Sequence, residues 1–315
     1  MRRFMFAVFV GVLAAFQTPP RSLSSQAGER PALNPLPGAS VTVLVDNMAG
    51  GGPVLGEWGV SFLVETGQHR ILFDTGAGQV LLGNARALGI DLRGTEAIVI
   101  SHGHDDHTAG LEKAIEACGP VNLFVHPVVF DTRYWKDDSG AVAFRLPLSR
   151  EQLGQRVRKL IETKEATAIC EGVMVSGQIP RVTDFEDTGV RRYAFLDESL
   201  KTPDPILDDQ AIFFRVPEGV VILLGCGHAG LVNTMRYVSE LTGEREIYAV
   251  MGGTHLLGVS PRRMKETVAA LKRYRVQRIL LSHCTGLGAY AEFATAFPGR
   301  CSWPASGTRV LFGKQ

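Results

Sequence analysis

The stretch Ser101–Gly110, with the sequence SHGHDDHTAG, is the feature that most constrains how this chain can fold. It places three histidines and two aspartates between His102 and His107. The residues before it, Ala97–Ile100, form a short apolar run typical of a buried strand, and His107–Cys118 after it has helical spacing. We therefore expect the polar side chains to lie on a strand-to-helix turn, where they can converge at the edge of a sheet.

The residue types of this turn favour a metal site over a simple capped turn. Neutral imidazoles and ionised carboxylates are ligands that suit zinc and its first-row neighbours. Three histidines at positions i, i+2 and i+5 would repel one another if charged. If they were buried and neutral, their ring nitrogens would be hard to supply with hydrogen-bond partners. Asp105 alone could instead be a helix cap, because an aspartate before a helix accepts backbone N–H bonds and suits the positive end of the helix dipole.

The pattern His102-x-His104-x-Asp106-His107 after a strand resembles the signature of the metallo-β-lactamase superfamily of metal-dependent hydrolases. Further segments resemble that superfamily in the order in which they occur along the chain: ILFDTG at 71–76, LLGCGHAG at 223–230, MGGTHL at 251–256 and ILLSHCTG at 279–286. The later blocks, with SGQIPR at 176–181 and DDQA at 208–211, resemble one branch, the dihydropterin or ribofuranosylaminobenzene 5'-phosphate synthase-like proteins. The resemblance covers about residues 40 to 312.

Strand and helix patterns alternate along the chain, which predicts a layered α/β protein. Strands are predicted at 41–45, 61–65, 71–73, 97–100, 122–125, 211–216, 220–224, 247–251, 278–281 and 308–312, and helices at 79–88, 107–118, 149–162, 231–241, 260–274 and 287–296. Periodicity leaves open whether the sheet is doubly wound or forms a two-sheet sandwich. The resemblance implies the latter, an αββα sandwich of two similar halves with the metals at one edge between the sheets.

Two segments do not have the sequence pattern of a hydrophobic core. Residues 50–59 form a glycine-rich loop that carries Trp58, and residues 127–147 carry Phe130, Tyr134, Trp135 and Phe144 among charged residues. Loops that present aromatic rings often line ligand sites, although such rings can also serve only to pin a loop to the body. Both interpretations stay open for both segments.

The resemblance divides the motif between two metal ions. It implies that His102 and His104 hold one ion with a third imidazole, and that Asp106 and His107 hold a second. His283, at the end of an apolar strand, matches the superfamily's final histidine.

Two positions depart from the superfamily pattern. Cys226 stands where many members place a bridging aspartate, and the usual middle histidine is not apparent before residue 220, where His126 precedes a proline. We predict that His228 supplies the missing imidazole. Cys226 could be a thiolate ligand, since contact with a metal deprotonates a thiol, or a buried spectator.

Three more residues are candidates for supporting roles. His255 ends another apolar strand after paired glycines, and it could bind substrate, protonate a leaving group, ligate a metal or be structural. Asp74 is predicted to orient a ligand histidine rather than to bind metal. Asp209 could reach the site, although adjacent acids in a loop are usually solvated. His69, in a predicted hairpin turn, is expected at the surface.

These residues predict a hydrolase with two metal ions, zinc first and iron or manganese as alternatives. A metal-bound hydroxide would attack the substrate. Asp106 would orient the hydroxide, and His255 would donate a proton to the leaving group. The substrate would be a small molecule with an ester, lactone, phosphodiester or β-lactam bond. The alternatives are a transferase like the ribofuranosylaminobenzene-phosphate synthases and a non-enzymatic metal-binding protein on the same scaffold.

The composition of the 315-residue chain is that of a globular protein, with 45% hydrophobic and 21% charged residues. The net charge of +1, with lysine and arginine scattered, gives no indication of a nucleic-acid partner. The five cysteines are odd in number and show no disulfide framework. Nothing in the pattern indicates an oligomeric state.

The N-terminus has the layout of a secretory signal peptide. A basic start, Met1–Arg3, precedes the apolar run Phe4–Phe16, and Ser25-Gln26-Ala27 offers small residues for cleavage. The run is shorter than the about 20 residues of a membrane span. We therefore predict a signal peptide at 1–27, a flexible lead-in at 28–39 and one domain at 40–315, with the mature protein secreted or periplasmic and without a stable membrane anchor.

Overall fold

The computed structural model describes residues 33–138, 140–186 and 194–314. The predicted signal peptide at 1–27 lies outside the described residues. The first described strand starts at Gly38, and before it the Leu36 amide donates to the carbonyl of Arg215 at 2.8 Å. Among these described residues, no helix combines the length and the apolar character that crossing a membrane requires.

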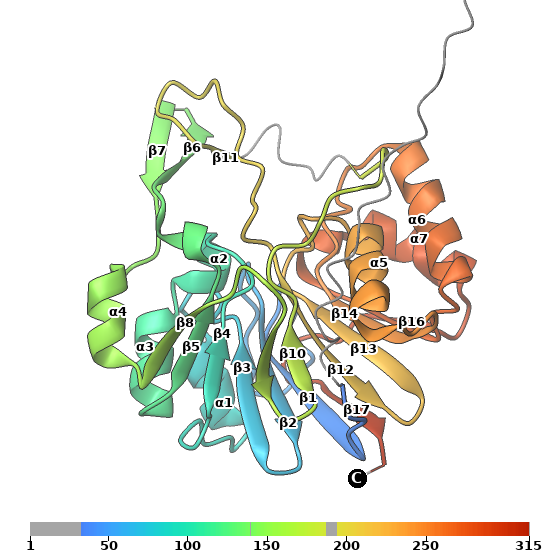
Figure 1. Cartoon of the computed structure of the whole chain (residues 1–315), viewed down its shortest axis with the longest axis horizontal. Helices are drawn as coiled ribbons and strands as arrows, with labels where there is room; N and C mark the ends of the chain where they lie inside the picture. The colour runs from blue at the N-terminus through green and yellow to red at the C-terminus, as the bar shows by residue number, and fades with distance from the viewer. Residues whose placement is uncertain (1–32, 139, 187–193, 315) are drawn as a thin grey trace, which may run out of the picture. The chain divides into compact units, whose positions relative to one another are not determined.

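Two seven-stranded sheets form the centre of the molecule (Figure 1). The first contains, in spatial order, β17 (Arg309–Gly313), β1 (Gly38–Val45), β2 (Ser61–Thr66), β3 (His69–Phe73), β4 (Ala97–Val99), β5 (Asn122–Val125) and β8 (Lys159–Glu162). The second contains β16 (Cys301–Ser302), β15 (Arg278–Leu281), β14 (Ile247–Gly252), β13 (Gly219–Leu224), β12 (Ala211–Val216), β10 (Val173–Val175) and β9 (Thr167–Cys170).

Each central strand is apolar on both faces because both faces are covered. In β13, Val221 and Leu223 belong to the core between the sheets, whereas Ile222 packs on the outer side with the helices. In β3, Phe73 belongs to the core between the sheets and Leu72 to the outer core. Successive side chains of a strand point to opposite faces, so a strand buried on both sides appears in sequence as a continuous apolar run.

Helices cover the outer face of each sheet. The first sheet packs against α1 (Leu81–Ala87), α3 (Leu111–Cys118) and α4 (Arg150–Arg156), and the second against α5 (Leu231–Thr242), α6 (Pro261–Arg273) and α7 (Leu287–Ala296). The order of layers is helix, sheet, sheet, helix, which confirms the predicted αββα sandwich and excludes the doubly wound single sheet.

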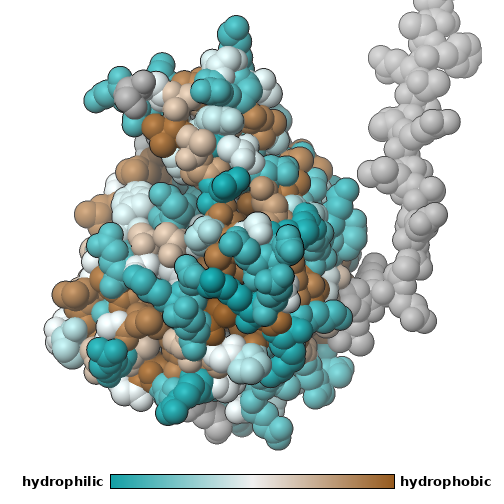
Figure 2. Space-filling model, turned by 90° about the vertical axis from the view of Figure 1, so that its left-hand side faces the viewer, coloured by the Kyte–Doolittle hydropathy of each residue, from teal (hydrophilic) through white to brown (hydrophobic). Residues whose placement is uncertain are grey.

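A third, three-stranded sheet stands beyond the strand ends near α2 (Asp105–Thr108) (Figure 1). It contains β11 (Ala194–Phe195), β6 (Arg133–Asp137) and β7 (Gly140–Phe144), and it follows the short 3-10 helix η1 (Pro127–Phe130). The aromatic-rich segment 127–147 is therefore largely an antiparallel β-ribbon. On the face shown in Figure 2, hydrophobic and hydrophilic residues are intermingled on this projecting part and on the body below it.

Two helix predictions are partly wrong. The segment Ser149–Glu162 forms α4 only as far as Arg156, and Lys159–Glu162 then pairs with β5 as the edge strand β8. The predicted helix at 107–118 is divided into α2, which ends at Thr108, and α3, which begins at Leu111, because the His107 carbonyl accepts from the Thr75 amide at 2.9 Å and from the Thr75 Oγ1 at 2.8 Å. In both cases a contact distant in sequence decides the local structure.

Candidate metal centre

The predicted ligands come together because strand ends from both sheets meet at one edge. Ser101 and the residues after it follow β4, and Gly225 and the residues after it follow β13. The two sheets approach so closely here that a Cβ on Gly225 would lie 2.1 Å from the Ser101 Oγ. Glycine is the residue type that permits this approach.

His102, His104 and His228 form a first group, called here the three-histidine group. One ring nitrogen from each lies within 4.8 Å of the others, and all three side chains are buried. The Nε2 atoms of His102 and His104 and both ring nitrogens of His228 have no hydrogen-bond partner among the described residues. Burial lowers the pKa of His104 to about 3 and holds the pKa values of His102 and His228 well below the usual value. Neutral, unpartnered nitrogens converging on one space fit a metal ion.

Asp106, His107, Cys226 and His283 form a second group, called the Asp106 group, whose ligand atoms also lie within 4.8 Å of one another. The His107 Nε2 lies 3.2 Å from the Cys226 Sγ, and the His283 Nε2 lies 3.1 Å from the Asp106 Oδ2. This donor set of imidazole, carboxylate and sulfur also fits a metal ion. The predicted ligands therefore lie in two neighbouring groups, with His228 in the first and Cys226 in the second.

The protonation of the Asp106 group differs from that of the three-histidine group. Burial works to lower the pKa of His107, but the carboxylates of Asp106 and Asp74 outweigh it and raise that pKa to about 9. Burial would raise the pKa of Asp106, yet His107 and His283 bring it below its usual range. Burial and the neighbouring Cys284 raise the pKa of Cys226 well above that of a free thiol.

Asp74 lies behind the ligands, as predicted for an orienting residue. Its Oδ2 accepts hydrogen bonds from the His107 Nδ1 and the Ser101 Oγ, both at 2.7 Å. The Ser101 Oγ in turn lies 2.9 Å from the His102 Nδ1. Because the Nδ1 atoms are engaged in this way, the Nε2 atoms of both histidines are turned toward the metal groups.

A pair that the sequence reasoning missed, Asp46 and Asn47, holds His283. The Asn47 Oδ1 accepts from the His283 Nδ1 at 2.9 Å, and the Asp46 Oδ1 accepts from the His283 amide at 2.9 Å. The Trp303 Nε1 donates to the Asp46 Oδ2 at 2.9 Å. The sequence does carry a signal, since Asp46 directly follows a buried strand, as Asp74 does.

Asp208 and Asp209 support the histidine loops. The Asp208 Oδ2 accepts from the amide of Gly103, between His102 and His104, at 2.7 Å. The Asp209 Oδ2 accepts from the amide of Ala229, next to His228, at 2.7 Å, and burial raises the pKa of Asp209 to about 7. Asp209 thus contacts the backbone beside a candidate ligand and belongs to neither metal group.

A pocket of about 240 Å³ opens onto both groups. The described residues that line it are Trp58, His104, Asp105, Asp106, Trp135, Cys226, His228, His255, Leu257, His283 and Cys284. His255 belongs to neither metal group, but its ring centre lies 4.3 Å from that of His228. Neither of the remaining two histidines is a member of a metal group: the His69 Nδ1 is 2.9 Å from Glu96, and His126 accepts from the Val128 amide at the start of η1.

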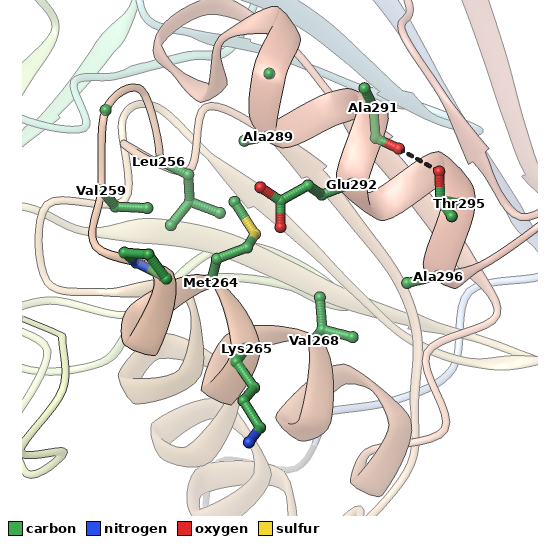
Figure 3. A pocket seen from close by; sticks show the side chains of 13 residues that line it. Leu256, Val259, Met264, Lys265, Val268, Ala289, Ala291, Glu292, Thr295 and Ala296 are labelled. Atoms are coloured by element: carbon green, nitrogen blue, oxygen red, sulfur yellow. Dashed lines mark hydrogen bonds between the residues drawn. The ribbon is translucent and has the colours of Figure 1, made fainter.

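A larger cavity of about 750 Å³ lies on the outer side of the second sheet, between α6 and α7 (Figure 3). Met264 and Val268 line it from α6, and Ala289 and Glu292 line it from α7. Leu256 faces this cavity, whereas its neighbour Leu257 lines the metal pocket. None of the candidate ligands lines the larger cavity.

Comparisons with known proteins identify the superfamily of the chain. Residues 59–238 match the family model of the metallo-beta-lactamase superfamily. The chain is 28% identical over 270 residues to the 7,8-dihydropterin-6-methyl-4-(beta-D-ribofuranosyl)-aminobenzene-5'-phosphate synthase of Methanocaldococcus jannaschii, with 82% of this chain and 91% of that protein covered. An uncharacterized protein of the same organism is 30% identical over 256 residues, with 81% of this chain and 93% of that protein covered.

Solved structures of the same superfamily resemble this chain in fold. Tm1679, described as a metal-dependent hydrolase of the beta-lactamase superfamily, is 27% identical with a TM-score of 0.73, and the match covers 86% of this chain and 98% of that one. YhfI of Bacillus subtilis, 13% identical with a TM-score of 0.52 over 87% of this chain and 99% of that one, shares the fold. The chain therefore belongs to the metallo-β-lactamase superfamily, with His, Asp and Cys groups that could hold metal ions.

Proposed function

We propose that this protein is an exported hydrolase that depends on two metal ions, zinc in the first instance, and that it cleaves an ester, lactone, phosphodiester or related bond in a small molecule. The observation that carries the proposal is the three-histidine group, whose buried Nε2 atoms converge without partners beside the Asp106 group. Two adjacent groups of this kind, open to one pocket, suit hydrolysis assisted by two metal ions.

Divalent ions bound there would supply Lewis acidity and a water of lowered pKa. The roles of the protein follow from its own geometry. Asp106 remains ionised because His107 and His283 lower its pKa, so its carboxylate can accept a hydrogen bond from the attacking water. His255 lines the pocket beside His228, where it can deliver a proton to the leaving group.

A transferase resembling the synthase of M. jannaschii is the second candidate, favoured by the 28% identity over most of both chains. The side chains that line the pocket help to choose between the hydrolase and the transferase. A substrate with a phosphate group is usually held by arginine or lysine side chains. Among the described residues that line the pocket there is neither to hold a phosphate away from the metal ions, as a ribose phosphate would require, which favours the hydrolase. The reacting group of a phosphodiester would instead be held by the metal ions themselves.

Metal content per chain, measured by elemental analysis on the wild type, His228→Ala and the control His69→Ala, is the first test. We expect two equivalents in the wild type and in the control, and one or fewer in His228→Ala. The same samples, assayed on esters, lactones and phosphodiesters, should show turnover that His228→Ala abolishes. Two equivalents without turnover on any of these bonds would contradict the hydrolase and favour a metal-binding or transferase role.

Export is proposed from the sequence of the N-terminus. Expression of the full chain in a bacterial host, followed by mass analysis of the periplasmic fraction, should yield a protein that begins near Gly28. Retention of the intact chain in the cytoplasm would contradict this part of the proposal.

A further inference from the structure

We infer that the substrate carries a compact, uncharged aromatic group next to the bond that is cleaved. This inference rests on the proposed hydrolytic function and narrows its substrate. It comes from the side chains that surround the metal groups at the mouth of the pocket.

One aromatic pair lies over the three-histidine group. Trp135 of β6 and Phe144 of β7 are diagonal neighbours on the ribbon, since Phe144 pairs with Arg133, and their rings form a stacked pair with centres 4.1 Å apart and an angle of 13° between the planes. The ring of Trp135 lies 4.7 Å from that of His104, and the ring of Phe144 lies 5.7 Å from it. Of the two, Trp135 also lines the pocket. A flat apolar group held at this metal group would therefore contact an indole ring.

A second pair of apolar side chains lines the pocket near the Asp106 group. The ring of Trp58 lies 5.1 Å from that of His283. Trp58 is 56% exposed and Leu257 is 60% exposed, although both are large and apolar. Apolar surface left open to solvent around a site that also holds polar groups is typical of a ligand site. Burying it under a ligand would be favourable.

The aromatic pair on the β-ribbon is fixed to the metal centre by a buried ion network. Arg133 precedes Trp135 by two residues on β6, so the two side chains leave the strand on the same face. Its guanidinium lies 3.0 Å from Asp204 and 2.8 Å from Asp208, and Asp208 in turn accepts from the Gly103 amide in the histidine loop. Trp135 is therefore held in position before a ligand arrives, which lowers the entropy cost of binding.

Charge and size set the remaining limits. The charged acids that line the pocket are Asp105 and Asp106, and no lysine or arginine lines it within the part of the chain that the structure describes. An anionic substituent on the part of the substrate away from the metal ions would therefore find no cationic side chain to pair with. The volume of about 240 Å³ exceeds the cavity of about 150 Å³ that accommodates benzene. An aromatic ring with the reacting bond attached fits these limits.

The inference can be tested by comparing the affinities of two metal-binding probes that share a head group, so that no turnover is needed. Acetohydroxamic acid and benzohydroxamic acid differ by a methyl and a phenyl group, and their dissociation constants for the metal-loaded protein can be measured by calorimetry. We expect the phenyl compound to bind about tenfold or more tightly, a difference of about 1.4 kcal/mol. In Trp135→Ala and in Trp58→Ala the ratio should fall to about threefold or less, with the binding of acetohydroxamic acid unchanged.

Leu257→Ala is a further test variant and Leu311→Ala is its matched control, because both remove an exposed leucine and only Leu257 lines the pocket. Leu257→Ala should lower the ratio and Leu311→Ala should leave it unchanged. Equal binding of the two hydroxamates to the wild type would overturn the inference, as would tighter binding of a para-phosphono derivative of benzohydroxamic acid. Failure of the protein to take up metal, shown by elemental analysis, would instead overturn the proposed function and the inference with it.

Discussion

The imidazoles of the two groups differ in the protons they carry before a metal binds. In the three-histidine group, burial keeps His102, His104 and His228 neutral at pH 7, so their nitrogen lone pairs are available. His107 is different, because the carboxylates of Asp106 and Asp74 raise its pKa to about 9. A metal ion entering the Asp106 group must displace that proton.

Proton release on metal binding should therefore distinguish the two groups. At pH 7 the first ion should enter the three-histidine group with almost no proton release. The second should release one proton from His107, and two if the thiol of Cys226 binds as well. A protonated imidazole cannot bind a metal, so the affinity of the second site should rise with pH at least as far as about pH 9. If the thiol of Cys226 also binds, the rise should continue above that pH, because the pKa of this thiol is raised well above that of a free thiol. Calorimetric titrations in two buffers of different ionisation enthalpy measure the protons. Equal release for both ions would contradict this assignment.

Asp74 has no direct place in either metal group, yet it should control affinity. Asp74→Asn keeps the size of the side chain and suits the positive φ of 60° at this position, but it removes the charge that faces the His107 Nδ1. We expect metal affinity to fall about 10–100-fold with the fold retained. Competition with a chromophoric chelator measures the affinity, and Asp91→Asn, at an exposed acid, is the control. Unchanged affinity would show that Asp74 does not orient the ligand.

At the scale of elements, the β6–β7 ribbon depends on Arg133. This side chain is buried and faces two buried carboxylates, Asp204 and Asp208. Burial works to lower the pKa of Arg133, but Asp208 and Asp204 outweigh it and raise the pKa. A buried ion pair adds little net stability, but removing one partner leaves the other charge without compensation.

Arg133→Met should therefore destabilise the protein by about 3–5 kcal/mol. The matched control is Arg236→Gln, which removes an exposed ion pair with Glu240 and should cost about 0.3–0.5 kcal/mol. Urea unfolding followed by circular dichroism gives both free energies. A loss below about 1 kcal/mol in Arg133→Met would mean that water replaces the guanidinium and that the ribbon is not anchored through it.

The elements themselves could be predicted wherever local pattern and burial agree. The strand prediction at 122–125 and the helix prediction at 287–296 coincide with β5 and α7. The strand β8 was missed, because its half-buried residues Leu160 and Ile161 fit a helical pattern as well as an edge strand. The partner that decides between the two is β5, which lies more than 30 residues earlier in the chain.

At the scale of the whole molecule, the candidate ligands connect the two sheets. His102 and His104 follow β4 of the first sheet, whereas His228 follows β13 of the second. The Asp106 group joins the sheets in the same way, through Cys226 and His283. A bound ion would tie the two halves of the sandwich together, so metal occupancy and stability should be linked.

Metal removal should therefore lower the melting temperature. With free metal at 100 times its dissociation constant, one bound ion adds about 2.7 kcal/mol, or roughly 5–10 °C for a domain of this size. Differential scanning calorimetry with and without chelator measures the shift, which should shrink in His228→Ala. Equal melting temperatures in the presence and absence of metal would contradict a site shared between the sheets.

The sequence by itself determined the superfamily, the layered α/β architecture and most of the candidate ligands, because strand-end motifs and apolar runs are local patterns. Only the tertiary structure placed Cys226 beside His107, put Asp46 and Asn47 behind His283, and brought Trp135 over His104. These contacts join residues from 31 to 237 positions apart, such as Asp46 and His283. Local periodicity carries no information about such pairs, since the meeting of two sheet edges fixes them.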